Sequence, residues 1–319
     1  MWKIALHLVN ASILSLRFYR RKSASLTGPL RVCLSLEGGL GDLVVGLNWV
    51  GGFYKKFSPL FPMELDIAFS NKQMLASFVP DFVHQMISFK EKDQHAYDLV
   101  INCVRCPVVE YADISRLPAV LLTYTEKLVD FESEHRDFLL LTPYKDTVTR
   151  NIVSSCIKRW HQPDILDEFN LTETFNYSVP VLAEAETLKK FGLYEKKYVT
   201  LNREGGSAQC WESTKLWPLA YYRELVEKLK EIYPDYELVE IGAGKGERLA
   251  NTHRNLAGKT SLEEIKVILK HATLHIDGEG GLVHLRHALK GGPCCVFFGP
   301  TSPKVYGYEE NINLYSSAC

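Results

Sequence analysis

The stretch TLHIDGEGGLVHLRHALKGGPCCVFFGP, residues 273–300, carries the pattern that decides the fold class. A short apolar run ends at Asp277, a glycine-rich segment with a second carboxylate follows, and an apparent helix leads to another apolar run. Short apolar runs of aliphatic and β-branched residues are typical of buried strands. Strand, helix and strand in succession predict a βαβ unit in a parallel sheet.

The same alternation occurs in both halves of the chain. The first half has LRVCLSL (30–36), then EGGLGD and an apparent helix, and the runs ELDIAF, HQMISF, YDLVINC and PAVLLTY predict further strands. The second half has the predicted strands KYVTLN, YELVEIGAG, TLHID and CCVFFGP. We therefore predict an α/β fold of two sheet domains in tandem, 28–180 and 181–319, preceded by an amphipathic helix over 1–27.

Two helices of the second half are predicted from their own signals. YYRELVEKLKEIY is amphipathic, with Leu225, Leu229 and Ile232 on one side. SLEEIKVILKHA begins with Ser261 and Glu264, the spacing of a capping box.

The composition excludes several function classes. With 46% hydrophobic and 24% charged residues the chain is an ordinary globular one, and its net charge of −1 gives no general attraction to nucleic acid. The eight cysteines are scattered, and Cys103 and Cys106 form a lone CxxC with no second pair at metal-site spacing. These thiols indicate buried cysteines in a reducing compartment, and no metal site is predicted.

The first 22 residues form an apolar run that ends in the basic cluster Tyr19-Arg20-Arg21-Lys22. The run lacks the charge order and cleavage site of a signal peptide, and it is too interrupted to span a bilayer comfortably. Two interpretations remain open, a helix on an anionic membrane surface and a helix packed on the first domain.

Glycine and acid gather at two predicted strand-to-helix junctions, 37–42 and 277–284. Ligands of open parallel sheets bind beyond the carboxyl ends of strands, where a helix start offers free N–H groups to a phosphate. The alternative is that the glycines make tight turns and Asp277 caps the helix. Arg203 and Lys215 are cations suited to a diphosphate, and Glu279 suits ligand hydroxyls, whereas Trp217 suits packing.

Three motifs follow one another along the chain: GLGD in the first domain, KLWP in the second, and acid-x-Gly-Leu-x-His-Leu followed by CCVFFGPTSP. In this order they resemble the motifs of the glycosyltransferase family that contains the ADP-heptose:lipopolysaccharide heptosyltransferases. The resemblance covers most of residues 30–315 and implies the GT-B arrangement, two Rossmann-like domains facing across a cleft. It also implies an inverting transfer without metal or other cofactor, with the acceptor on the first domain and the nucleotide-sugar donor on the second.

Site residues follow from this resemblance position by position. Asp42 matches the general base, in an acceptor-side loop with Gly39 and Gly41, and Lys215 matches the lysine that contacts the donor's phosphates. Gly280, Gly281, Leu282 and His284 match the glycine segment that receives the donor. Arg203 and Glu279 are added for their chemistry. The expected donor-binding set is therefore Arg203, Lys215, Glu279, Gly280, Gly281, Leu282 and His284.

The sequence departs from the family pattern in two places. Glu279-Gly280-Gly281 stands where the family usually has Asp-Ser/Thr-Gly, which leaves the identity of the donor open. Members often continue past the last strand with a helix, whereas this sequence ends at Cys319, so either a truncated chain or a second domain that is closed differently is expected. The predicted function is transfer of a sugar, heptose first among the candidates, to a bacterial surface glycan such as lipopolysaccharide core. The predicted place is the cytoplasmic face of the inner membrane. The alternatives are a nucleotide-sugar epimerase and an inactive nucleotide- or glycan-binding protein.

Overall fold

The computed structural model describes most of the chain between residues 28 and 315. The described ranges are 28–36, 38–92, 96–103, 107–141, 178–204, 216–244, 247–299 and 302–315. The predicted helix over 1–27, together with Lys215 and Cys106, lies outside these ranges. The chain divides into two compact units. The first contains 28–38 and Gly46–Leu140, and the second contains Tyr177–Cys319 together with Gly39–Val45 at the start of the first long helix.

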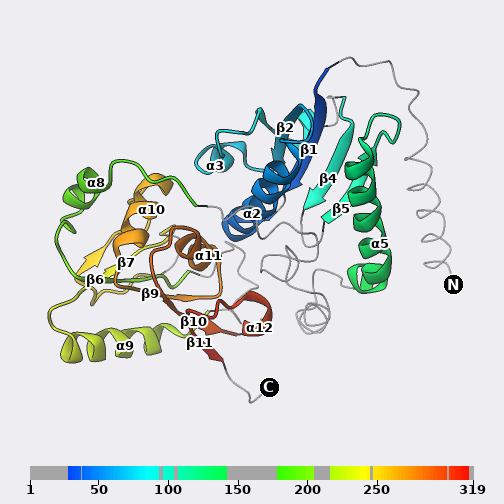
Figure 1. Cartoon of the computed structure of the whole chain (residues 1–319). Helices are drawn as coiled ribbons and strands as arrows, with labels where there is room; N and C mark the ends of the chain where they lie inside the picture. The colour runs from blue at the N-terminus through cyan, green and yellow to red at the C-terminus, as the bar shows by residue number, and fades with distance from the viewer. Residues whose placement is uncertain are drawn as a thin grey trace. The chain divides into compact units, whose positions relative to one another are not determined.

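The first unit is built around a five-stranded sheet with the order β3-β2-β1-β4-β5 (Figure 1). Its elements are β1 (Leu30–Leu36), α2 (Leu40–Phe57), β2 (Met63–Phe69), α3 (Lys72–Ala76), β3 (Gln85–Ile87), α4 (Phe89–Lys92), β4 (Leu99–Cys103), β5 (Pro107–Ala112) and α5 (Ala119–Leu141). The first four strands in space are parallel, and β5 is antiparallel to β4. Counted by sequence this is the 3-2-1-4 order of a Rossmann-like sheet.

The predicted strand PAVLLTY is wrong, because these residues begin the long helix α5. Leu121, Tyr124 and Leu128 are all buried, and their spacing of three and four residues places them on one helix face. The aromatic rings of Phe53 and Phe57 on α2 pack against Tyr124, with centroids 5.9 and 4.9 Å away. Packing against α2 therefore selects the helix over the strand that the aliphatic run suggests. Strand β5 was not predicted.

The second unit holds a six-stranded sheet in which every neighbouring pair is parallel. Its elements are α8 (Glu184–Lys190), β6 (Tyr198–Leu201), α9 (Leu219–Ile232), β7 (Glu237–Glu240), β8 (Arg254–Asn255), α10 (Leu262–His271), β9 (Leu274–Gly278), α11 (Gly281–Ala288), β10 (Cys294–Phe298), α12 (Pro303–Tyr306) and β11 (Ile312–Tyr315). The spatial order β8-β7-β6-β9-β10-β11 is the Rossmann order 3-2-1-4-5-6. The prediction of α/β folding with two Rossmann-like sheets is confirmed.

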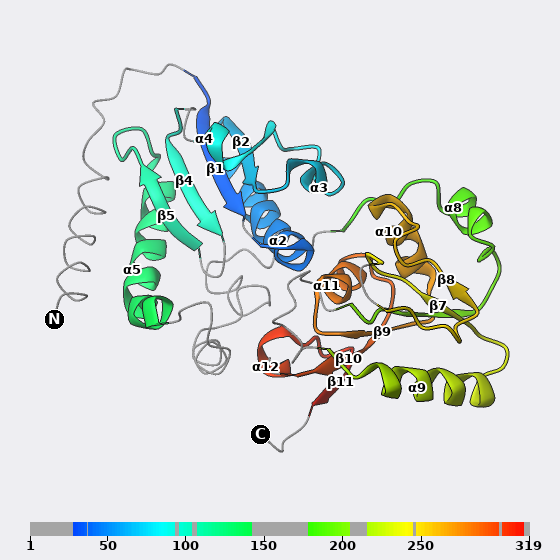
Figure 2. The ribbon, with the colours of Figure 1, turned by 180° about the vertical axis from the view of Figure 1, so that it is seen from behind.

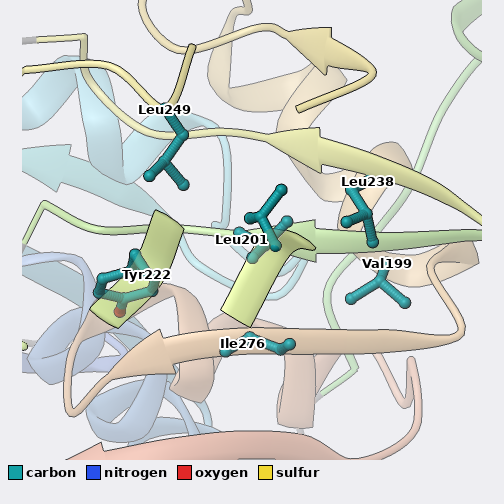
Figure 3. Packing of buried hydrophobic residues seen from close by; sticks show 7 residues of the cluster. Val199, Leu201, Tyr222, Leu238, Leu249 and Ile276 are labelled. Atoms are coloured by element: carbon teal, nitrogen blue, oxygen red, sulfur yellow. The ribbon is translucent and has the colours of Figure 1, made fainter. Parts of the chain in front are cut away.

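Helices cover both faces of this second sheet (Figure 2). Tyr222 and Val226 of α9 pack on one face against a cluster that includes Leu201 and Ile276, part of which Figure 3 shows. On the opposite face Val283 of α11 packs against alternate residues of β10. Strands buried on both faces explain why the sequence of this sheet consists of nearly continuous apolar runs.

Two details of the helices test the sequence predictions. The capping box of α10 is present, since the Ser261 hydroxyl accepts from the Glu264 N–H and the Glu264 carboxylate accepts from the Ser261 N–H. On α9 the predicted apolar side is partly wrong. Leu225 and Leu229 pack on the core, but Ile232 is 63% exposed because it lies at the last position of the helix.

None of the helices in the described ranges is long and apolar enough to cross a membrane.

Candidate functional site

The carboxyl ends of β6 and β9 are neighbours at the centre of the second sheet. In the Rossmann order these are the first and fourth strands, and the chain reverses its direction of winding between them. Ligands of open α/β sheets bind at this position. The segment after β9 is the predicted glycine segment, and the segment after β6 begins with Asn202 and Arg203.

A buried hydrogen-bonded network joins these two strand ends. The Nδ2 of Asn202 lies 3.0 Å from both carboxylate oxygens of Asp277, and the Nε2 of His275 lies 3.2 Å from Asp277 Oδ2. The other ring nitrogen of His275 lies 3.0 Å from the hydroxyl of Thr200. Asp277 is 2% exposed and His275 is fully buried. Burial raises the pKa of Asp277, while the bonds from His275 and Asn202 act in the opposite direction.

Asp277 does not cap α11, so that part of the alternative is wrong. The N-cap of α11 is Gly280, with no side-chain hydrogen bond. The carboxylate of Asp277 is instead directed into the sheet by Asn202 and His275. Its role in the described structure is to hold β6 and β9 together at their carboxyl ends.

The network continues to the end of β7. Asn202 Oδ1 accepts from the Glu204 N–H at 3.2 Å, and Glu204 Oε2 accepts from the Gly244 N–H at 2.9 Å. A Cβ on Gly242, whose φ is +137°, would lie 2.7 Å from Asn202 Oδ1. The third strand end is therefore tied to the other two through a position that requires glycine.

Sequence reasoning missed Thr200, Asn202, Glu204 and His275. A signal was present, since all four lie within or directly after strands that point to one edge of a parallel sheet. Which of them meet depends on strand order, and strand order cannot be deduced from the pattern of one chain.

Of the two predicted cations, Arg203 lies in the described ranges. The guanidinium of Arg203 donates to the backbone carbonyl of Glu247, in the segment between β7 and β8. Close by, Glu240 accepts from the Leu249 N–H at 3.0 Å. Burial raises the pKa of Glu240, and the charge of Arg203 acts against that shift. Lys215, the second predicted cation, lies outside the described residues.

The glycine segment leads directly into α11. The Glu279 N–H donates to the Phe297 carbonyl at 3.2 Å, so β10 holds the backbone of this segment. Gly280 has an extended backbone, and Gly281 and Leu282 form the first turn of the helix, where N–H groups lack intrahelical acceptors. His284 is 7% exposed, and its Nδ1 lies 2.7 Å from the hydroxyl of Tyr308.

The other predicted junction starts α2. Asp42 is an exposed residue in the first turn, and its Oδ2 accepts from the Gly39 N–H at 2.9 Å. This is the backward half of a capping box, in which a side chain at the third helical position satisfies the N–H of the cap residue. Gly41, between them, is buried. The bond orients the carboxylate of Asp42 and leaves the residue accessible to solvent.

Metal ligands do not cluster among the described residues. No group of three or more His, Cys, Asp or Glu side chains there has the geometry to hold an ion.

Two sheets in the Rossmann order, with polar and glycine-containing strand ends, define this chain as an α/β protein of the Rossmann-like class. The profile of glycosyltransferase family 9 (heptosyltransferase) matches residues 119–318, which is more than half of the chain. The chain belongs to glycosyltransferase family 9. The match does not favour the epimerase alternative.

Curated relatives match over a shorter stretch. The chain is 31% identical over 137 residues to lipooligosaccharide heptosyltransferase 2 of Haemophilus influenzae, a match that covers 38% of each chain. It is 30% identical over 101 residues to lipopolysaccharide heptosyltransferase 2 of Escherichia coli, covering 28% of each. The alignments thus span well under two thirds of these relatives' length.

Solved structures share the fold across nearly the whole chain. A glycosyltransferase family 9 protein from Veillonella parvula aligns with a TM-score of 0.58 at 15% identity, covering 93% of this chain and 90% of that one. The E. coli ADP-heptose lipopolysaccharide heptosyltransferase II aligns with a TM-score of 0.55 at 15% identity, covering 90% of each. An iron-containing dodecameric glycosyltransferase from enterotoxigenic E. coli aligns with a TM-score of 0.53 at 15% identity, covering 92% of this chain and 64% of that one.

Proposed function

We propose that this chain is an inverting glycosyltransferase that moves heptose from ADP-heptose to a lipopolysaccharide core glycan. The observation that carries the proposal is the family match over 119–318, which includes the whole second sheet and its glycine segment. The names of the relatives from Haemophilus influenzae and Escherichia coli support heptose and lipopolysaccharide. ADP is supported by the name of one structural neighbour.

In this proposal residues 181–319 bind the donor. The diphosphate lies at the start of α11, where the N–H groups of Gly281 and Leu282 and the positive end of the helix dipole favour an anion. Glu279 accepts hydrogen bonds from donor hydroxyls, and His284 supplies a further polar contact. Arg203 and Lys215 offset the charge that develops on the departing nucleoside diphosphate, so the reaction needs no metal.

Residues 28–180 bind the acceptor, and Asp42 acts as the general base. The acceptor hydroxyl attacks the anomeric carbon on the face opposite the nucleotide, its proton passes to the Asp42 carboxylate, and the bond to the diphosphate breaks. The hydrogen bond from Gly39 fixes the orientation of this carboxylate, which a base needs more than high basicity. Gly39, just before α2, leaves the backbone beside the acceptor without a side chain, and Gly41 in the first turn of α2 is buried, where a Cβ would lie 2.7 Å from His284 Cδ2.

The proposed location is the cytoplasmic face of the inner membrane. The apolar run and basic cluster of residues 1–22 suit contact with an anionic membrane surface, where a lipid-linked acceptor would be presented.

The test is release of ADP from ADP-heptose, measured with and without lipopolysaccharide core acceptor. We expect release that depends on the acceptor and persists in EDTA. Interconversion of free nucleotide sugars would identify an epimerase, and binding of ADP-heptose without turnover would identify an inactive binding protein. Release only with the GDP, UDP or CDP sugar would keep the reaction and replace the donor. Loss of activity in EDTA that an added metal restores would overturn metal independence.

A further inference from the structure

Tyr308 lies between α12 and β11, and its ring is part of the core of the second unit. The ring packs with Val283 of α11 and with alternate residues of β10, namely Cys294, Val296 and Phe298. Its backbone carbonyl accepts from the amide of Asn313 at 2.9 Å, which holds the loop in place. The side chain is 8% exposed, so the position of its hydroxyl is set by the core.

The hydroxyl of Tyr308 meets the imidazole of His284. The oxygen lies 2.7 Å from His284 Nδ1, and the two rings are edge to face, with centroids 5.5 Å apart. His287, one turn later on α11, stacks on the Tyr308 ring at 3.8 Å and nearly parallel to it. The phenol ring of Tyr308 thus contacts both His284 and His287, but its hydroxyl is hydrogen-bonded to His284, the one nearer the start of the helix.

The direction of this hydrogen bond follows from the phenol. Burial raises the pKa of Tyr308 far above its usual range, so the hydroxyl keeps its proton. Within the described residues, His284 Nδ1 lies at hydrogen-bond distance from the Tyr308 hydroxyl and can accept its proton. If Nδ1 carried the proton instead, the buried O–H would lose its acceptor, which is disfavoured. The 2.7 Å separation also fits an O–H donor better than an N–H donor.

We infer that Tyr308 is a positioning residue that holds neutral His284 in the tautomer with its proton on Nε2, so that this nitrogen donates a hydrogen bond to an anionic oxygen of the nucleoside diphosphate. In neutral imidazole one nitrogen donates and the other accepts, so a bond made at Nδ1 decides what Nε2 can do. The opposite tautomer would turn a lone pair toward the diphosphate. This inference rests on the proposed donor site at the start of α11.

The first experiment determines the tautomer by ¹⁵N NMR of the full-length chain with labelled histidine. The spectrum of His284→Gln assigns the His284 signals. We expect the unprotonated type of nitrogen at Nδ1 and the protonated type at Nε2. In Tyr308→Phe, which keeps the ring but removes the hydroxyl, a mixture of the two tautomers is expected. A proton on Nδ1 in the unsubstituted protein would overturn the inference.

The second experiment measures the dissociation constant for ADP by titration calorimetry. Loss of one charge-assisted hydrogen bond predicts about tenfold weaker binding by Tyr308→Phe. Glutamine at 284 places an amide N–H near the position of Nε2 and has no tautomers. In the His284→Gln background, Tyr308→Phe should therefore change the affinity less than about twofold.

The matched control is Tyr198→Phe. It removes a hydroxyl that is also buried in the second unit, where it donates to the Ile268 carbonyl at 2.8 Å. We expect it to lower the melting temperature about as much as Tyr308→Phe and to leave the ADP affinity unchanged. Folded Tyr308→Phe that binds ADP like the unsubstituted chain would overturn the role of Tyr308 alone. An unsubstituted chain that binds none of ADP, GDP, UDP or CDP would overturn the proposed function itself.

Discussion

At the residue scale, two carboxylates near strand ends have opposite surroundings. Asp277 is buried, and its carboxylate oxygens are hydrogen-bonded to Asn202 and His275, so this carboxylate has a structural role. Asp42 is exposed and accepts one backbone N–H, so it is oriented but accessible. Of the two, Asp42 is therefore the one that we propose as the general base.

Asn in place of Asp42 tests this assignment. The amide oxygen of Asp42→Asn can still accept from the Gly39 N–H, so the melting temperature should change little. Because the amide cannot take a proton, we expect kcat to fall about 10²- to 10⁴-fold, with the KM for the donor nearly unchanged. Steady-state ADP release measures both constants.

The control for that variant is Asp113→Asn. Asp113 is another carboxylate that accepts from backbone nearby, from the Ser115 N–H at 3.1 Å, and it should retain full turnover as asparagine. Full turnover by Asp42→Asn would remove Asp42 from the mechanism.

The network around Asp277 makes a prediction about pH. In Asn202→Asp two carboxyl groups face each other in a buried site, and burial already raises the pKa of Asp277. A carboxyl whose pKa is higher in the folded than in the unfolded state binds more protons when folded, so its destabilising effect grows as pH rises and is relieved as pH falls. We expect Asn202→Asp to cost about 3–5 kcal/mol at pH 8, as an unpaired buried charge does, and much less near pH 5.

Urea unfolding at several pH values measures this difference. Asn202→Ala removes the amide without adding an acid, so the stability that it loses should vary less with pH than the loss in Asn202→Asp. If both variants had the same pH profile, the close approach of positions 202 and 277 would be refuted.

At the element scale, the sequence predicts those strands and helices that the spacing of apolar residues and the capping residues determine. The strands around Leu34, Thr200 and Val296 were predicted because parallel strands buried on both faces are continuously apolar. The capping box of α10 was predicted because it needs only Ser261 and Glu264. Residues 119–124 could not be assigned correctly, since an aliphatic run fits strand and buried helix alike, and only packing of Tyr124 against α2 separates them.

Arg286 shows what sequence cannot predict for an element. Its fully buried guanidinium donates to the carbonyls of Ala272, Gly292 and Pro293, at 2.8, 3.2 and 3.2 Å, and to that of Leu269. It thus satisfies carbonyls at the carboxyl end of α10 and in the turn before β10. A cation on the amphipathic helix α11 would ordinarily be expected on the exposed face.

We expect Arg286→Met to lower the free energy of unfolding by about 3–5 kcal/mol. Methionine fills much of the space but leaves several buried carbonyls without donors, each at a cost of about 1–3 kcal/mol before relaxation. Urea denaturation measures the loss. The matched variant Arg223→Met removes an exposed arginine paired with Glu247, and it should cost less than about 1 kcal/mol. Equal losses would show that the buried guanidinium contributes no more than a surface ion pair.

At the scale of the whole molecule, both sheets follow the Rossmann order, and each has a glycine segment beside the strand where the order reverses. The segments after β1 and β9 were predicted as candidate sites from glycine and acid at strand ends. What the sequence could not supply is the set of partners at the second of these ends. Asn202 and Asp277 are 75 residues apart and meet only because β6 and β9 are neighbours.

Hydrogen exchange with and without ADP tests the proposed division of labour between the two units. A bound nucleotide suppresses opening of the segments that it contacts, in proportion to its occupancy. Because the diphosphate is proposed to lie at the start of α11, we expect slower exchange in peptides covering 199–204 and 276–289. Peptides covering the edge strand β11 should be unchanged, and so should those covering β2 and β3 of the first sheet.

Since Tyr308→Phe weakens binding without moving the site, it should show the same pattern at higher ADP concentration. Protection confined to the first sheet would place the nucleotide on the wrong unit for this proposal, because the family match over 119–318 contains none of that sheet's strands.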